Sequence, residues 1–434
     1  MTDFSMFGLR PVLMTGLQTQ GFDTPTPIQA RAIPLIMQGR DLLGLAQTGT
    51  GKTLAFGLPV MHALLGAGRP APKTTQALIL APTRELVNQI AATLDGFARK
   101  TPLKVQRVVG GAGLHPQIQK LAKGCDILVA TPGRLLDLLD RRALTLDATQ
   151  MLVLDEADQM LDLGFIHALR RIASLLPKQR QTLMFSATMS KQMNEIAEAY
   201  LDRPERIQVS PPGKPAEKID QSVHFVAQGD KARLLEGYLN AHPEELALVF
   251  ARTKHGAEKL MKLLGSWGIA AGSIHGNKSQ GQRERTLQAF REGKIKVLVA
   301  TDVAARGIDI PDMRHVYNYE LPEVPENYVH RIGRTARAGA SGRAIAFCAP
   351  AEMGDLRAIE RLMKRDLAVI GGTPWPDDLA GPARAAARKR GPKRGGPRPM
   401  RAHDGEGRKP RAKRHGKPQG HGKPEMKGRT RQSA

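Results

Sequence analysis

Short apolar runs alternate with longer amphipathic stretches along most of the chain. The runs predict strands at residues 77–80, 104–109, 127–129, 151–154 and 182–185, then at 222–226, 247–250, 270–274, 296–299, 315–319 and 343–347. Helical periodicity between them predicts parallel α/β sheets with right-handed crossovers, with ligands bound where strands end.

A break in composition divides this pattern in two. The segment Ser210-Pro211-Pro212-Gly213-Lys214-Pro215 can continue neither a helix nor a sheet. We therefore predict an N-terminal motif region at 1–30, α/β domains at 31–209 and 221–370 joined by a linker at 210–220, and a tail at 371–434.

The tail has a composition of its own. Residues 381–434 hold 18 Lys and Arg against 3 acids, which is +15 of the formal net charge of +24, and contain no Leu, Ile, Val, Phe, Tyr or Trp. Such a segment cannot bury enough apolar surface to offset chain entropy, so it is predicted to be disordered. Its charge suits nonspecific contact with a polyanion through counterion release. A merely solubilising extension is the alternative.

The remaining composition excludes several classes of protein. Aromatic residues make up only 4% of the chain, which disfavours an aromatic-rich β-sandwich. The cysteines are Cys125 and Cys348, too few for a disulfide framework or a cysteine zinc site. Neither a leader pattern nor an apolar run of about 18 residues occurs, so a soluble cytoplasmic protein is expected.

A phosphate-binding loop is predicted in the string Ala46, Gln47, Thr48, Gly49, Thr50, Gly51, Lys52, Thr53. Its glycines allow a tight turn whose N–H groups face an anion at a helix N-terminus. Lys52 would reach the β and γ phosphates, and the Thr53 hydroxyl would ligate Mg²⁺. The usual pattern begins with glycine where this chain has Ala46, and an ordinary glycine turn is the alternative.

Carboxylates after the apolar run 151–154 predict the second half of a nucleoside triphosphatase site. Asp155 is placed to hold Mg²⁺ mainly through water, and Glu156 to orient the attacking water. The alternative is a solvated acidic turn at a helix start. Hydroxyls of Ser186 and Thr188, after the run 182–185, could couple this site to neighbouring elements, although an ordinary Ser/Thr turn fits equally well.

The second half carries arginines at three-residue spacing. Arg331, Arg334 and Arg337 would lie along one face of a helix or helical turn. Like charges so placed favour an anion opposite them, so Arg334 and Arg337 are predicted arginine fingers that act on a γ-phosphate after domain closure. A surface cluster paired with acids is the alternative.

In this order, the motifs resemble those of the DEAD-box ATP-dependent RNA helicases of superfamily 2, and among bacterial members the RhlE group. Residues 21–29 resemble the family's Q motif, with Phe4 at the spacing of its upstream aromatic. The resemblance implies that Phe4, Phe22 and Gln29 contact ATP. A carboxamide fits adenine N6 and N7, so Gln29 would select ATP over GTP.

The resemblance also implies contacts with the RNA backbone. The first-domain residues so matched are Pro82, Thr83, Arg84, Gly110, Gly111, Thr131, Pro132, Gly133 and Arg134, and the second-domain ones are Arg252, His275, Gly276, Gln282, Arg285 and Thr301. Gly307 and Asp309 would contact the nucleotide. Asp158, Ser186, Thr188, His330 and Arg331 would couple the sites. Ala336 departs from the family, which more often has glycine there.

Together these matches imply two tandem RecA-like domains that close around ATP, Mg²⁺ and single-stranded RNA, and open short duplexes with little sequence preference. The expected protein is a monomer that works in ribosomal or RNA-decay assemblies, with the tail tethering RNA. Two alternatives stay open. One is a superfamily 2 translocase on DNA; the other is a non-catalytic RNA clamp, annealer or assembly scaffold dominated by the tail.

Overall fold

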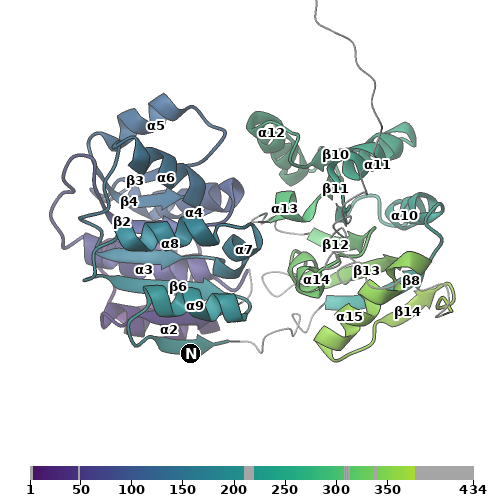
Figure 1. The fold of residues 1–434 in the computed structure, drawn as a ribbon, viewed down its shortest axis with the longest axis horizontal. Helices are drawn as coiled ribbons and strands as arrows, with labels where there is room; N and C mark the ends of the chain where they lie inside the picture. Colours follow the sequence, from purple (N-terminus) through teal and green to yellow (C-terminus); the bar gives the residue numbers. More distant parts are fainter. Residues whose placement is uncertain are drawn as a thin grey trace, which may run out of the picture. The chain divides into compact units, whose positions relative to one another are not determined.

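The computed structural model describes residues 3–46, 49–209, 219–306, 308, 310, 313–336 and 341–376. Two seven-stranded sheets, each fully parallel, lie in the first and second halves of the chain (Figure 1). The predicted fold class, two tandem parallel α/β domains, is therefore confirmed.

The first sheet has the order β3-β4-β2-β5-β6-β1-β7, and the second β10-β11-β9-β12-β13-β8-β14. The first contains β1 (Leu42–Leu45), β2 (Thr75–Leu80), β3 (Val105–Val108), β4 (Cys125–Ala130), β5 (Met151–Leu154), β6 (Gln181–Ser186) and β7 (Glu205–Gln208). The second contains β8 (Ile219–Phe225), β9 (Leu246–Phe250), β10 (Ala271–Ile274), β11 (Val297–Ala300), β12 (Met313–Asn318), β13 (Gly342–Cys348) and β14 (Ala368–Gly371).

Helices cover both faces of each sheet (Figure 1). In the first domain they are η1 (Phe4–Phe7), α1 (Pro11–Thr19), α2 (Pro27–Met37), α3 (Lys52–Leu64), α4 (Arg84–Ala98), α5 (Leu114–Leu121), α6 (Pro132–Asp140), α7 (Ala157–Asp162), α8 (Ile166–Leu175) and α9 (Lys191–Tyr200). In the second they are α10 (Lys231–Asn240), α11 (Lys254–Ser266), α12 (Gln280–Arg291), α13 (Asp302–Ala305), α14 (Pro325–Ile332), η2 (Pro350–Glu352) and α15 (Met353–Met363).

Each strand supplies side chains to two cores because successive residues of a strand point to opposite faces. In β2, Ile79 packs with α1 to α4, whereas Leu78 and Leu80 pack with α5 to α9. Both faces being buried, these strands read as continuous apolar runs in the sequence. None of the helices in the described ranges combines the length and the apolar character that a membrane crossing requires.

The N-terminal region is part of the first domain's core. Phe4, Phe7, Leu13 and Leu17 are buried in the same cluster as the apolar residues of α2, α3 and α4. Residues 1–30 therefore do not form a separate module in packing terms. At the other boundary, β8 begins at Ile219, two residues before the predicted start of the second domain.

Most of the predicted linker and nearly all of the predicted tail lie outside the described residues, as do several predicted site residues: Gln47, Thr48, Gly307, Asp309 and Arg337.

Candidate nucleotide site and nucleic-acid-facing surface

The phosphate loop links the end of β1 to the start of α3. Gly49 and Gly51 have φ of +84° and +91°, conformations that L side chains rarely adopt. Lys52 is the first residue of α3, and Thr53 follows it in the first helical turn. The N–H groups at this helix start thus have the position that an anion requires, with Ala46 buried at the base of the loop.

The loop lysine meets the carboxylate that follows β5. Lys52 Nζ lies 3.6 Å from Asp155 Oδ1 and donates a hydrogen bond to the Ala46 carbonyl at 3.3 Å. Burial raises the pKa of Asp155 to about 6; Lys52 opposes that rise, and the neighbouring Glu156 adds to it. Hard oxygen ligands suit Mg²⁺, so the carboxylate of Asp155 and the hydroxyl of Thr53 form a fitting donor set.

Glu156 has a strained backbone. Its φ of +51° places a non-glycine residue in the left-handed region, at the N-cap of α7. Its N–H donates to Asp155 Oδ1 at 3.0 Å, and its side chain is buried. Strain of this kind persists where surrounding structure holds it, often at functional sites. Here the bend directs two successive carboxylates into one buried region.

Residues of the predicted Q motif hold the phosphate loop directly. Gln29 Nε2 donates to the Gly51 carbonyl at 3.0 Å, while Gln29 Oε1 accepts from the Thr26 N–H at 2.8 Å. The Thr26 hydroxyl donates to the Thr50 carbonyl at 2.8 Å. Gln29 is only 3% exposed. One end of its carboxamide therefore holds the loop and the other caps α2, roles that adenine selection alone did not predict.

The two aromatic residues of the predicted adenine site differ in accessibility. Phe4 is buried and packs edge-on against Phe7. Phe22 is 39% exposed, with its other face stacked on Phe97. Phe22 is thus the ring with a face open to a ligand, and Phe4 supports the core beneath.

The last residue of the acidic tetrad binds the segment after β6. Asp158 Oδ2 accepts hydrogen bonds from the N–H groups of Ala187 and Thr188 at 3.0 and 2.9 Å, and from the Thr188 hydroxyl at 3.0 Å. The Ser186 hydroxyl donates to the Thr188 carbonyl at 2.7 Å. The structure therefore brings together three of the predicted coupling residues.

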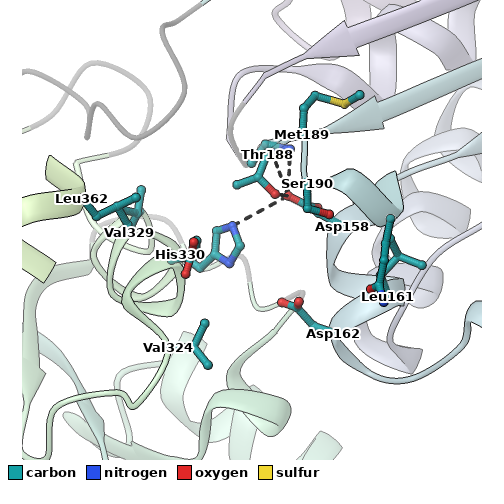
Figure 2. A pocket seen from close by; sticks show the side chains of 14 residues that line it. Asp158, Leu161, Asp162, Thr188, Met189, Ser190, Val324, Val329, His330 and Leu362 are labelled. Atoms are coloured by element: carbon teal, nitrogen blue, oxygen red, sulfur yellow. Dashed lines mark hydrogen bonds and ion pairs between the residues drawn. The ribbon is translucent and has the colours of Figure 1, made fainter. Parts of the chain in front are cut away.

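His330 of α14 faces the same carboxylate. Its Nε2 lies 3.9 Å from Asp158 Oδ2, and Figure 2 shows the imidazole pointing toward it. A cavity of about 580 Å³ opens beside this pair and is lined by both polar and apolar side chains, among them Asp162, Met189, Val324 and Leu362 (Figure 2).

The first arginine of the predicted series lies near the end of α14. Helix α14 ends at Ile332, because Gly333 follows and the chain turns. Arg331 makes a bidentate ion pair with Asp302 and also donates to the Glu320 carbonyl at 2.6 Å. Asp302, in its own domain, is thus the anion opposite Arg331. That the three guanidinium groups share one face stays a prediction.

Arg334 lies just beyond α14 and is 2% exposed. It donates to the carbonyls of His330 and Ile308 at 3.2 and 3.0 Å. Its role as an arginine finger stays a prediction, as does that of Arg337, which is outside the described residues. Ala336, where the family more often has glycine, has a φ of +56°.

Most predicted first-domain RNA contacts gather at the carboxyl ends of β2, β3 and β4. They line a cavity of about 490 Å³, whose walls include Pro82, Thr83, Arg84, Gly110, Thr131, Gly133, Arg134 and also Gly276. Pro132 starts α6 beside them. Gly111 has φ of +75°, which favours glycine, and a Cβ there would lie 2.1 Å from Arg84 Nη1 and so displace that guanidinium.

The predicted RNA contacts of the second domain differ in the partners that they have within the protein. Thr301 is the N-cap residue of α13, and His275 is hydrogen-bonded to Glu258 at 3.1 Å. Arg252, however, is bound to Glu352 at 3.1 Å and to the Leu321 carbonyl at 3.0 Å. Its guanidinium therefore already has buried partners within the domain.

Gln282 and Arg285 are the RNA contacts that the sequence predicts on α12. The Gln282 side chain accepts from the Ser279 N–H in a capping box, and Arg285 is exposed. Two of their neighbours contact the first domain: Gln280 accepts from Arg84 Nη1 at 3.2 Å, and Arg283 pairs with Glu85 at 3.0 Å. RNA contacts by Gln282 and Arg285 stay a prediction. The sequence signal available was the Ser-x-x-Gln capping box, which assigns Gln282 to the helix start.

A phosphate loop, an Asp-Glu-Ala-Asp tetrad and two parallel α/β domains define a nucleoside triphosphatase of the two-domain helicase type. Residues 26–196 match the DEAD/DEAH box helicase family, and 230–339 match the helicase conserved C-terminal domain. The chain belongs to the DEAD/DEAH box helicase family.

Named relatives agree with this assignment. The ATP-dependent RNA helicase CshA of Listeria monocytogenes serovar 1/2a is 45% identical over 389 residues, which cover 90% of this chain and 74% of that protein. The structure of S. cerevisiae Dbp5 bound to RNA and ADP BeF3 has 31% identity and a TM-score of 0.77, covering 87% of this chain and 98% of that one. Mss116p bound to ssRNA and AMP-PNP has 27% identity and a TM-score of 0.78, covering 87% and 80%. Resemblance to the RhlE group in particular stays a prediction.

Proposed function

We propose that this protein is an ATP-dependent RNA helicase that opens short duplexes and remodels RNA–protein complexes by ATP-driven closure of its two domains. The observation that carries the proposal is the buried contact between Lys52 and Asp155 in a chain of this family. Relatives described as RNA helicases, and structural neighbours bound to RNA and to ATP analogues, support it.

The first domain provides the groups that hydrolysis needs. ATP enters with its phosphates on the loop N–H groups, and Lys52 turns from the Ala46 carbonyl to the phosphate oxygens. Thr53 and Asp155 would hold Mg²⁺, which would supply charge neutralisation at the transferring phosphate. Glu156 orients the attacking water. Gln29 keeps the loop in shape and contacts adenine with its remaining hydrogen-bonding capacity.

Coupling runs through Asp158. This carboxylate joins the end of the nucleotide site to Thr188, whose carbonyl accepts from Ser186, and faces His330 of the second domain. Closure brings Arg334, with Arg337, to the γ-phosphate, so ATP binding favours the closed state and hydrolysis releases it.

RNA binds at the surface formed by Arg84, Arg134 and the strand-end glycines, together with Gln280 and Arg283 of α12. Main-chain N–H groups and arginines at strand ends contact phosphates and carry little base information, which predicts weak sequence preference. Contacts to the 2′-hydroxyl would discriminate against DNA. The basic tail tethers RNA, and its contribution should fall steeply with salt.

The test is the ATPase rate without nucleic acid, with single-stranded RNA and with DNA of matched sequence. It would use the full chain, the Lys52→Ala variant and a chain ending near Leu379. Strong stimulation by RNA alone, lost in Lys52→Ala and kept after truncation, is the expected result. Equal stimulation by DNA would favour a translocase instead. RNA annealing by Lys52→Ala at the normal rate, lost on truncation, would favour the non-catalytic scaffold.

We further propose that the protein is a monomer acting in ribosome assembly or RNA decay. Sucrose-gradient sedimentation of cell extracts, with and without RNase, would separate these roles: ribosomal association predicts co-migration with a subunit precursor.

A further inference from the structure

A tight turn in the second domain places a histidine beside a glutamate. Residues 242–245, which follow α10, form a turn closed by a 3.2 Å hydrogen bond from the Glu245 N–H to the His242 carbonyl. Pro243 occupies the second position of the turn, where its fixed φ suits the geometry. His242 Nδ1 consequently lies 3.9 Å from Glu245 Oε2.

A register shift in the neighbouring strand brings a second histidine to this turn. β12 pairs with β9 with an irregularity between Met313 and His315, next to Ala247. Such bulges re-aim side chains. His315 Nε2 is hydrogen-bonded to Glu245 Oε2, and the His315 ring lies between those of His242 and Tyr317, with centroids 4.8 and 5.8 Å away.

One nitrogen from each histidine and one oxygen from Glu245 lie within 4.8 Å of one another. Tetrahedral Zn²⁺ with bonds of about 2.0–2.2 Å separates its ligands by roughly 3.3–3.6 Å. Small side-chain rotations bring the group to that spacing. A cavity of about 270 Å³ adjoins the cluster, with Asp220 on its wall, and leaves room for water or a carboxylate as the fourth ligand.

We propose that His242, Glu245 and His315 form a binding site for Zn²⁺ or a similar imidazole-preferring divalent ion. Two imidazoles and one carboxylate favour Zn²⁺ over Mg²⁺ or Ca²⁺, which prefer all-oxygen sites. The ion would fasten the turn after α10 to β12. His315 and the adjoining Arg343 lie near the amino ends of their strands, whereas the predicted ATP and RNA residues follow strand carboxyl ends.

Metal binding requires one ring nitrogen of each histidine to be free of its proton. His315 Nδ1 is buried, with no hydrogen-bond partner among the described residues. Moving the ring proton from Nε2 to Nδ1 therefore breaks no second bond. At His242 the situation differs, because Nε2 lies 3.4 Å from Arg343 Nη1, which can only donate. Metal on Nδ1 leaves the proton on Nε2, facing that donor, so Arg343 must turn away.

Arg343 therefore gives the proposal a directional test. Replacing it with glutamine removes a positive charge beside the ion and supplies an oxygen that can accept from the His242 Nε2–H. Arg343→Gln should bind Zn²⁺ more tightly than the natural chain, by about tenfold, whereas His242→Asn and Glu245→Gln should bind at least 100-fold more weakly. Glu244→Gln is the matched control, since Glu244 is exposed in the same turn and pairs with Lys296 at 3.3 Å.

The experiment titrates Zn²⁺ into full-length, tag-free, chelator-stripped protein in competition with a chromophoric chelator, and records Co²⁺ absorption in parallel. Histidines in residues 377–434 add the same background of Zn²⁺ binding to every variant, so the result is read from the differences in Zn²⁺ binding between variants. The natural chain and Glu244→Gln should bind one more equivalent than His242→Asn, with a tetrahedral Co²⁺ spectrum.

Far-UV circular dichroism and the Mg²⁺-dependent ATPase rate report whether each variant is folded. Both should be unchanged in His242→Asn. If that variant were misfolded, Glu245→Gln at its exposed position would decide the matter. Equal stoichiometry and affinity in the natural chain, His242→Asn and Glu245→Gln would overturn the proposal, and so would weaker binding by folded Arg343→Gln.

Discussion

Replacing Gln29 with alanine should weaken the binding of every nucleoside triphosphate, because this side chain holds the phosphate loop. The substitution removes the hydrogen bond from Gln29 Nε2 to the Gly51 carbonyl, at 3.0 Å, and the one that Oε1 accepts from the Thr26 N–H, at 2.8 Å. Gln29, which makes both bonds, is only 3% exposed. The loop then loses its bond to Gln29 and keeps the one that the Thr26 hydroxyl donates to the Thr50 carbonyl.

The expected size follows from those two bonds. Each contributes about 0.5–1.5 kcal/mol net, so their loss costs about 1–3 kcal/mol if the loop must be reordered on binding. At about 1.4 kcal/mol per factor of ten, KM should rise about 5- to 150-fold. The loop does not distinguish bases, so this factor should be common to ATP and GTP. The predicted contact of Gln29 with adenine should add a further rise in KM for ATP that GTP does not show.

Steady-state ATPase and GTPase measurements at saturating RNA would give both factors. Thr26→Val is the matched comparison, because it removes only the hydroxyl bond to the Thr50 carbonyl, at 2.8 Å, and leaves Gln29 in place. Its KM should rise equally for both nucleotides and by less than in Gln29→Ala. Thr26→Ser keeps the hydroxyl and should behave as the natural chain does.

An unchanged KM for GTP in Gln29→Ala would refute the role in holding the loop. An unchanged ratio of ATP to GTP specificity would instead count against the predicted contact with adenine. One experiment therefore tests the two roles of Gln29 separately: the KM for GTP tests its hold on the loop, and the ratio of ATP to GTP specificity tests its contact with adenine.

Four further predictions concern the acidic site and the segment after α14. Glu156→Gln should bind ATP and RNA with little turnover, and normal single-turnover hydrolysis by this variant would remove Glu156 from its assigned role. Since the pKa of Asp155 is raised to about 6 and Mg²⁺ requires the carboxylate, kcat/KM should fall up to tenfold per pH unit below about 6; a flat profile down to pH 5 would contradict this. The same shift makes Asp155 favour unfolding increasingly as pH rises from 3.8 to about 6, so Asp155→Asn should flatten stability across that range in urea titrations. Ala336→Gly should raise the free energy of unfolding by about 0.5–1 kcal/mol, because Ala336 has φ of +56°, and equal or lower stability would show that the left-handed backbone costs little here.

Most strands buried on both faces could be predicted from the sequence, although β1, whose four residues are all buried, was missed. Two strands with little buried apolar content, β7 and β14, were missed as well. Continuous apolar runs marked β2, β4, β5 and β9 because both faces of a parallel sheet are covered. β7 buries only Ile207 among its residues, and β14 lies at a sheet edge with Val369 and Ile370 about half exposed. β7 and β14 are strands because they pair with strands that are distant in the sequence, and their own hydrophobic pattern does not indicate it.

At the candidate site, residue types indicated the chemistry but not the pairing of side chains. The loop and tetrad predicted that Lys52 and Asp155 meet, because both follow buried strands of one sheet. Nothing in the spacing showed that Asp302 neutralises Arg331, or that Gln280 and Arg283, rather than their neighbours, contact α4. Such partners depend on which helix face the packing leaves open.

The position of β1 within its sheet has a consequence for synthesis on the ribosome. β1 carries the phosphate loop, yet it pairs with β6 and β7, which come from the far end of the domain's sequence. A nascent chain that has passed the loop therefore has no partner strand for β1 until β6, which ends at Ser186, has emerged. At about 5–20 residues per second, the unpaired segment waits for roughly 7–28 seconds. During that interval nucleotide cannot assist its folding, because the strand that carries the phosphate loop is not yet part of a sheet.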